Sequence, residues 1–174
     1  MTDLRYPIGT YDPLTNTTAA QRSVLIEHIA AAPQQLRAAV QNLSPAQLDT
    51  PYRPEGWTVR QVVHHVVDSH LNSYIRFRWA LTEDEPLIKA YDENAWAKLP
   101  DANTADPGVS LALLETLHKR WVLLLQALTP EQFNRTLRHP EAGLLKLETM
   151  LGLYAWHGQH HIAHITTLRE RMEW

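Results

Sequence analysis

The chain has 174 residues, of which 44% are apolar and 20% are charged. This composition is that of an ordinary globular protein and excludes a disordered, collagen-like or coiled-coil chain, and the length predicts one domain over residues 1–174. With 16 Lys and Arg against 19 Asp and Glu, the formal charge of −3 leaves no net positive field for nucleic acid or an anionic membrane. Because cysteine is absent, disulfides and thiolate chemistry are excluded, and any bound metal must use nitrogen and oxygen ligands.

The N-terminal stretch is polar and contains Pro7, Gly9 and Pro13, which indicates an irregular arm laid over the domain. It lacks a basic start followed by an apolar run, and no segment approaches the roughly 20 apolar residues that span a bilayer. We therefore expect a cytoplasmic protein that does not enter a membrane.

The first two helices have clear start signals. Thr18 with Gln21, and Thr58 with Gln61, are capping-box pairs that predict helix starts. The expected apolar stripe of the first helix continues past Pro33, where a kink is predicted because proline lacks an N–H donor. This stripe consists of Val24, Leu25, His28, Ile29, Leu36, Val40 and Leu43. The second helix runs without glycine or proline from Val59 to Glu85.

The second half of the chain predicts a long connection and two further helices. Residues 85–108 read as the connection, with a helical turn at Asp92–Lys98. Asp106 and Pro107 are typical of a helix start, and Thr129-Pro130 ends that third helix. The fourth helix covers about 147–171. Since no strand-type alternation persists, the sequence predicts an all-α four-helix bundle with a long connection between helices two and three.

Histidines concentrate in two of these helices. In the fourth helix, the pairs His157/His161 and His160/His164 each have the four-residue spacing that places two imidazoles on one face. The otherwise apolar stripe favours the first pair as facing inward. That stripe consists of Leu147, Met150, Tyr154, His157, His161, Ile165 and Leu168. Gly158, costly inside a helix, indicates close approach of another group.

The second helix offers a third ligand. A catalytic zinc site uses three protein ligands and a water, and either His64 or His65 could supply the third imidazole. Periodicity alone does not choose between them. Asp68 is a candidate acceptor for the other N–H of a ligand histidine.

These histidines, and several tryptophans, also have simpler structural interpretations. A single histidine on an apolar face is usually a core residue, but several buried imidazoles on two helices without a partner would be costly. Trp57, Trp121 and Trp156 are interpreted as packing residues. Glu115-x-x-His118 matches half of a di-iron ligand set, but no second Glu-x-x-His exists, so a di-iron site is rejected.

Several segments together resemble the YfiT group of the DinB-like family, provisionally described as metal-dependent hydrolases. They span nearly the whole chain in order: 6–9 (YPIG), 48–53 (LDTPYR), 56–65 (GWTVRQVVHH), 68–70 (DSH), 72–77 (NSYIRF) and 156–164 (WHGQHHIAH). The resemblance implies a DinB/YfiT four-helix bundle that forms a homodimer. It also implies one divalent metal ion per chain, with zinc or nickel favoured, on His65, His157 and His161.

The function that the resemblance implies is hydrolysis of a small-molecule substrate, with the metal ion activating water. Two alternatives stay open. Other DinB-like relatives use the same metal to bind a low-molecular-weight thiol, which would make the protein a thiol S-transferase, and a non-catalytic metal- or ligand-binding module is the third interpretation. The catalytic residues are not assigned; Asp68 and His160 are the candidate general bases.

Overall fold

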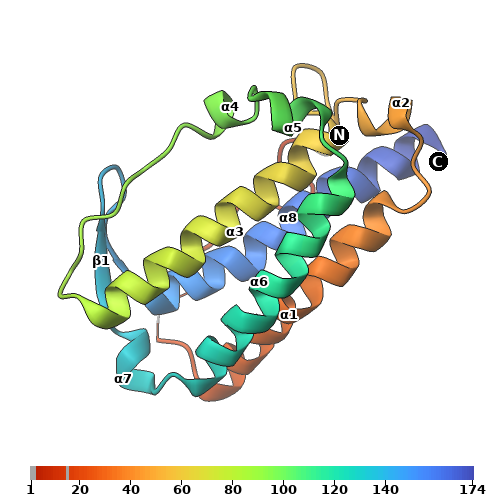
Figure 1. Ribbon diagram of the computed structural model, residues 1–174. Coiled ribbons are helices and arrows are strands. Elements are labelled where there is room, and N and C mark those ends of the chain that lie inside the picture. Colours follow the sequence, from red (N-terminus) through yellow and green to blue (C-terminus); the bar gives the residue numbers. More distant parts are fainter. Residues whose placement is uncertain (1–2, 15) are drawn as a thin grey trace.

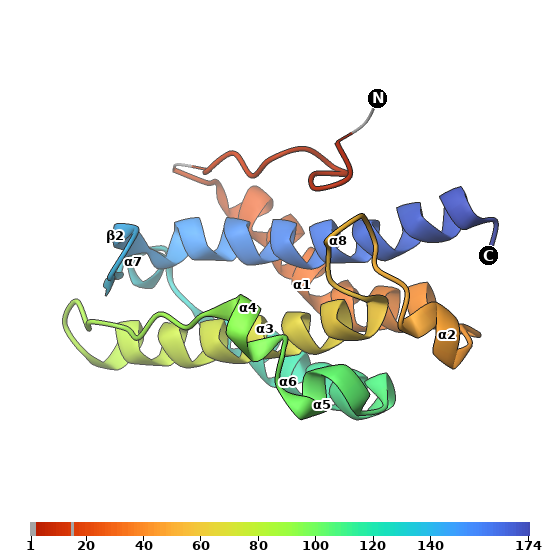
Figure 2. The ribbon, with the colours of Figure 1, turned by 90° about the horizontal axis from the view of Figure 1, so that it is seen from above.

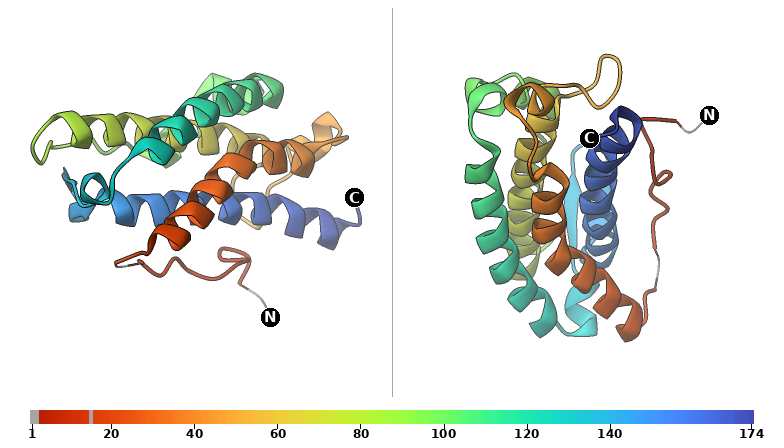
Figure 3. Two further views of the ribbon diagram at one scale, coloured as in Figure 1. Left: turned by 90° about the horizontal axis from the view of Figure 1, so that it is seen from below. Right: turned by 90° about the vertical axis from the view of Figure 1, so that its right-hand side faces the viewer.

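The computed structural model describes residues 3–14 and 16–174. Four long helices form a bundle: α1 (Ala19–Val40), α3 (Val59–Thr82), α6 (Pro107–Ala127) and α8 (Leu147–Met172) (Figure 1). Helix α1 packs against α8 and α6, and α3 packs against α6 and α8. Helices α6 and α8 lie on opposite sides of the bundle (Figure 3, right). The predicted all-α four-helix bundle is confirmed.

Capping residues set the starts of the long helices. Both predicted capping boxes are present, at Thr18 for α1 and at Thr58 for α3, and Asp106 caps α6 by accepting from the amide of Gly108. Helix α1 passes through Pro33 as one continuous element, with Pro33 buried. None of the helices in the described chain is long and apolar enough to cross a membrane.

The predicted apolar stripe of α1 was partly wrong. Val24 is 49% exposed and His28 is also exposed. The buried face follows the regular three- and four-residue spacing of an α-helix instead. Its members are Ile26, Ile29, Ala32, Pro33, Leu36 and Ala39.

The connections hold short helices. The predicted turn at Asp92–Lys98 corresponds to α4 (Glu93–Trp96), and α5 (Pro100–Thr104) follows it. Helix α2 (Pro45–Leu48) lies between α1 and α3. Thr129-Pro130, expected only to end the third helix, also caps and begins α7 (Pro130–Phe133). Helices of one turn are too short to show a period, so only cap residues mark them.

The expectation of a chain without strands was wrong. Strands β1 (Thr136–His139) and β2 (Gly143–Lys146) form an antiparallel hairpin. Each strand has four residues, too few for an alternation to stand out. The long connection is attached to this hairpin, because the amide of Ile88 donates to the Arg138 carbonyl at 3.0 Å.

The interior is divided into two apolar clusters. One is centred on Phe77, Trp121 and Leu151, and the other on Leu36 and Val63. On α3 and α8, buried or half-buried histidines lie in sequence between the residues of one cluster and those of the other, and on α6 the buried His118 lies next to Leu117, where the first cluster begins. The N-terminal arm lies along α8 as predicted (Figure 2), where the Tyr11 hydroxyl donates to the Thr149 carbonyl at 3.0 Å.

Candidate metal centre

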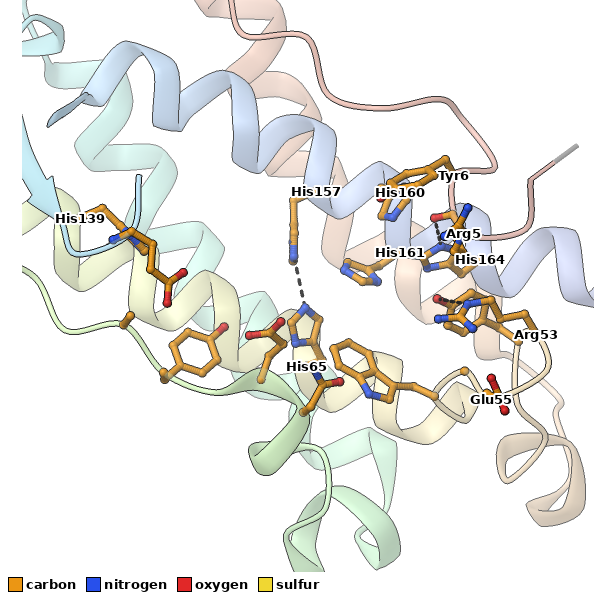
Figure 4. A pocket seen from close by; sticks show the side chains of 18 of the residues that line it. Arg5, Tyr6, Arg53, Glu55, His65, His139, His157, His160, His161 and His164 are labelled. Atoms are coloured by element: carbon orange, nitrogen blue, oxygen red, sulfur yellow. Dashed lines mark hydrogen bonds between the residues drawn. The ribbon is translucent and has the colours of Figure 1, made fainter. Parts of the chain in front are cut away.

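Three histidines from two helices converge in the middle of the bundle. His65 projects from α3 toward His157 and His161 on α8 (Figure 4). One nitrogen from each ring lies within 4.8 Å of the other two, and the Nε2 atoms of His65 and His157 are 3.3 Å apart. The structure therefore brings together the three histidines that the resemblance selected.

The structure also separates His65 from its neighbour His64. The Nδ1 atom of His64 lies 2.7 Å from the Ser110 hydroxyl, and its Nε2 atom lies 3.3 Å from the Ala105 carbonyl. His64 thus contacts the start of α6 and the turn before it. Successive residues of a helix point about 100° apart, so adjacent histidines face different neighbours.

The three converging imidazoles are neutral near pH 7. Burial lowers the pKa of His65 to about 4. Burial and the neighbouring histidines lower the pKa values of His157 and His161 well below the usual value of an imidazole. A neutral imidazole has one unprotonated nitrogen, which is the form that binds metal.

The donor set fits a divalent metal ion. Two nitrogens of a tetrahedral centre with bonds of about 2.0–2.1 Å are about 3.3–3.4 Å apart. The 3.3 Å separation of the His65 and His157 nitrogens matches that edge. In addition, the buried Nδ1 atom of His161 has no hydrogen-bond partner within residues 3–14 and 16–174.

Trp57 packs against this cluster from the loop before α3. Its ring centroid lies 4.5 Å from that of His65 and 6.4 Å from that of His161, with the latter rings nearly parallel at 18°. The interpretation of Trp57 as a packing residue holds, but the surface on which it packs is the histidine cluster.

A cavity of about 500 Å³ opens onto the three histidines. Its walls come from the N-terminal arm, the loop before α3, the long connection, the hairpin and α8. The polar and aromatic residues that line it include Arg5, Tyr6, Tyr52, Arg53, Trp57, Arg76, Tyr91, Glu93, His139, His160 and His164. Helical spacing had identified His160 and His164, but the residues from the arm, the loop before α3 and the long connection lie in irregular segments, where no periodic signal could have identified them.

The second histidine pair of α8 lines the cavity outside the three-nitrogen cluster. His160 stacks on Trp156 with ring centroids 4.3 Å apart. His164 stacks on Tyr52 at 4.0 Å, and its Nε2–H donates to the Arg5 carbonyl at 3.1 Å. These two imidazoles therefore connect the arm and the loop before α3 to the helix that carries the cluster.

The contact expected of Asp68 is made by another residue. In the described part of the chain, the Asp68 carboxylate makes no hydrogen bond to an imidazole, whereas Nδ1 of His157 lies 3.2 Å from Nε2 of His70. Burial, with a further contribution from Asp101, raises the pKa of Asp68 to about 6. His70 belongs to the segment 68–70 of the resemblance, and no spacing in the sequence pointed to its contact with His157.

The rejected di-iron motif does not form a site. Glu115 is exposed, with Lys119 at 2.8 Å and Arg37 at 3.6 Å. His118 is 1% exposed, and its Nε2 atom lies 2.9 Å from Nδ1 of His70. The two members of the motif thus face different environments.

Comparisons with known proteins agree with the fold and identify the family. The model of the DinB superfamily matches residues 28–165. The chain is 55% identical over 174 residues to a protein of Bacillus mycoides (strain KBAB4), covering 100% of both chains. It is 53% identical over 173 residues to YfiT of Bacillus subtilis (strain 168), covering 99% of this chain and 97% of YfiT. Both relatives carry the provisional name of a metal-dependent hydrolase.

Solved structures show the same arrangement. A structure of YfiT from Bacillus subtilis, described as "a probable metal-dependent hydrolase with an unusual four-helix bundle topology", superposes with a TM-score of 0.97 over 99% of both chains. The four-helix bundle protein TT2238 is 22% identical, with a TM-score of 0.55 over 81% of this chain and 94% of TT2238, and shows likeness of fold alone. The family match, the identity over nearly the full length and the shared bundle together establish that this chain belongs to the YfiT group of the DinB superfamily.

Proposed function

We propose that this protein is a metal-dependent hydrolase that holds one divalent ion through His65, His157 and His161 and acts on a small molecule. The observation that carries the proposal is the convergence of three neutral imidazoles on a cavity of about 500 Å³. Cavities of this size commonly hold small-molecule ligands. The names of the relatives support the same reaction class.

Neutral ligands determine the charge of such a site. A divalent ion held by three imidazoles keeps its +2 charge, lowers the pKa of a bound water toward about 7 and can polarise a carbonyl oxygen. His157 and His161 supply two nitrogens from successive turns of α8, and His65 supplies the third from α3. Imidazole ligands suit zinc and nickel, the two metals that we propose.

The two candidate general bases differ in position. His160 lines the cavity, whereas Asp68 is not among its lining residues. Burial lowers the pKa of His160 to about 4, so the ring is neutral near pH 7 but only weakly basic, and its place in the cavity rather than its basicity favours it. His160 is therefore the better candidate for proton transfer with a bound substrate.

Elemental analysis of untagged protein tests the metal site, and a panel of esters and amides tests the reaction. We expect about one zinc or nickel per chain, and His157→Ala should remove both metal and hydrolysis. Each assay is run with and without a low-molecular-weight thiol. Turnover of an electrophile that requires the thiol would replace the hydrolase by the thiol S-transferase. Metal binding without turnover, with or without thiol, would favour the third interpretation, a non-catalytic metal- or ligand-binding module.

The assembly and the location are further proposals. We propose a homodimer, as the resemblance implies, and a location in the cytoplasm. Light scattering on the purified protein measures the mass of the assembly, for which a dimer of 20.0 kDa chains is expected. A monomeric mass at micromolar concentration would contradict the dimer.

A further inference from the structure

A row of three imidazoles runs from the metal centre across the bundle to the backbone of α1. Nδ1 of His157 lies 3.2 Å from Nε2 of His70, and Nδ1 of His70 lies 2.9 Å from Nε2 of His118. Nδ1 of His118 then lies 2.6 Å from the carbonyl oxygen of Ile29. The row therefore connects α8, α3, α6 and α1 through side chains at the centre of the molecule.

The carbonyl at the end of this row is available because of a proline. In an α-helix the carbonyl of residue 29 normally accepts from the amide of residue 33. Residue 33 is Pro33, which has no N–H to donate. The Ile29 carbonyl therefore lacks its usual partner within α1, and His118 occupies that position.

The carbonyl sets the direction of every hydrogen bond in the row. A carbonyl oxygen only accepts, so Nδ1 of His118 must carry the proton, and its Nε2 must accept. Because Nε2 of His118 accepts, Nδ1 of His70 must donate to it, and Nε2 of His70 is then an acceptor. Nδ1 of His157 is then the donor, and its Nε2 is the unprotonated atom that faces His65.

These directions hold because each intermediate ring has a single N–H. His70 is 0% exposed and His118 is 1% exposed, and no carboxylate contacts either ring within the described chain. Burial lowers the pKa of His118 to about 4, and an imidazolium at His70 would be buried without a counter-charge. Both imidazoles are therefore neutral and have one donor and one acceptor each.

The rings are also held in place by packing. Tyr154 and Trp121 meet the His70 ring edge-on, at centroid distances of 5.2 and 5.9 Å. A Cβ atom at Gly158 would lie 3.6 Å from Cε1 of His70, in contact with the ring. This is an ordinary contact distance, so the backbone of α8 at Gly158 packs closely beside the His70 ring.

We propose that His70 and His118 are positioning residues that transmit the acceptor character of the Ile29 carbonyl to His157 and hold it in the Nδ1–H tautomer, with Nε2 free for the metal. Free neutral histidine side chains favour the opposite, Nε2–H tautomer. The row thus prepares His157 for coordination before any ion arrives. It acts at a distance, because His118 touches neither the metal ligands nor the cavity.

Nitrogen-15 NMR of the metal-free, full-length protein with labelled histidines tests the tautomers directly. We expect His157, His70 and His118 all to show a protonated Nδ1 and an unprotonated Nε2. Assignment of His157 as the Nε2–H tautomer in the wild type would overturn the inference.

Two substitutions at position 118 distinguish the hydrogen-bonding role of His118 from the effect of its side-chain packing. In His118→Gln the amide oxygen can accept from His70 and the amide N–H can donate to Ile29, so the row is kept. In His118→Leu both contacts are lost, and His157 is free to adopt the Nε2–H tautomer. We expect zinc affinity, measured by competition with a chelator, to fall about 10- to 100-fold in His118→Leu and to recover most of that loss in His118→Gln.

His64→Leu is the matched control, since it removes another buried histidine with two hydrogen bonds from the same region. It should lower stability but leave zinc affinity and the tautomer of His157 unchanged. Equal zinc affinities in His118→Leu and the wild type, or an equal loss in His64→Leu, would refute a positioning role.

The affinity measurement rests on the proposed metal site, whereas the NMR measurement does not. If the wild type binds no metal yet has the three expected tautomers, the proposed function fails and the row stands. If the wild type binds metal with His157 in the other tautomer, the row fails and the proposed function stands. Should His118→Leu fail to fold, the wild-type spectrum and His118→Gln still decide the question.

Discussion

Two adjacent histidines of α3 have different environments and different expected roles. His65 lies against Trp57 and His157, whereas His64 is hydrogen-bonded toward Ser110 and Ala105. The rotation between neighbouring helix positions sends one ring into the bundle centre and the other toward α6. Although both residues are histidines, only His65 therefore reaches the proposed metal centre.

The pair His65→Ala and His64→Ala tests this difference. His65→Ala removes a proposed ligand, so we expect metal affinity to fall by more than the roughly 10- to 100-fold that loss of a supporting hydrogen bond costs. His64→Ala should keep about one metal ion per chain. Elemental analysis and chelator competition measure both variants. If His64→Ala lost the metal and His65→Ala kept it, His65 would not be the third ligand.

At the scale of one element, Pro33 has a role that its burial alone does not explain. A proline inside a helix removes one backbone hydrogen bond, and here the unpaired carbonyl of Ile29 accepts from His118 on α6. The defect in α1 is thus compensated by a contact between helices. The structure of one helix and the tautomers of the rings across the bundle depend on the same atom.

A double-mutant cycle on α1 and α6 measures this compensation. His118→Leu leaves the buried Ile29 carbonyl without a partner, which costs about 1–3 kcal/mol beyond the lost packing. Pro33→Ala supplies an amide N–H for that carbonyl, so the same His118→Leu change should cost less when combined with it. Urea unfolding of the four proteins gives the coupling energy. Additivity within about 0.5 kcal/mol would show that the two positions act independently.

At the scale of the whole molecule, several neutral histidines lie in the interior of the bundle together with the two apolar clusters. A continuous apolar core would be the more common solution for a bundle of this size. Here His157, His70 and His118 are hydrogen-bonded to one another and to the backbone, and the imidazoles of His65, His157 and His161 converge. The centre of the molecule is therefore sensitive to protonation.

The metal-free protein should lose stability as the pH falls below about 6.5. Since burial lowers the pKa of His118 to about 4, the unfolded chain binds a proton between these values that the folded chain does not. The free energy of unfolding therefore decreases with falling pH, by up to about 1.4 kcal/mol per pH unit from this one residue.

Urea unfolding in the presence of a chelator, at several pH values between 7 and 4, measures this slope. His118→Gln has no imidazole at that position, so its stability should fall less steeply than that of the wild type. Parallel curves for the two proteins would contradict a buried, neutral His118.

The predictions from sequence succeeded where a pattern repeats or a cap is local. Thr18 and Thr58 marked two helix starts, and the long stripe of α8 placed His157 and His161 on its inward face. The prediction failed at the hairpin of residues 136–146 and at α5, because elements of four or five residues contain too few positions to show a period.

The sequence by itself determined the four helices, the absence of thiolate ligands and, through several matched segments, the DinB-type bundle with its histidine-rich helices. Helical periodicity did not separate His65 from His64, and the choice of His65 rested on the resemblance. Only the tertiary structure showed the different neighbours of these two rings, formed the cavity from loops far apart in the chain and aligned His157, His70 and His118 with the Ile29 carbonyl. Helical periods and caps arise from neighbouring residues, so they can be read along one segment. The direction of a hydrogen-bonded row depends on side chains from four helices, whose relative positions appear only when the bundle is assembled.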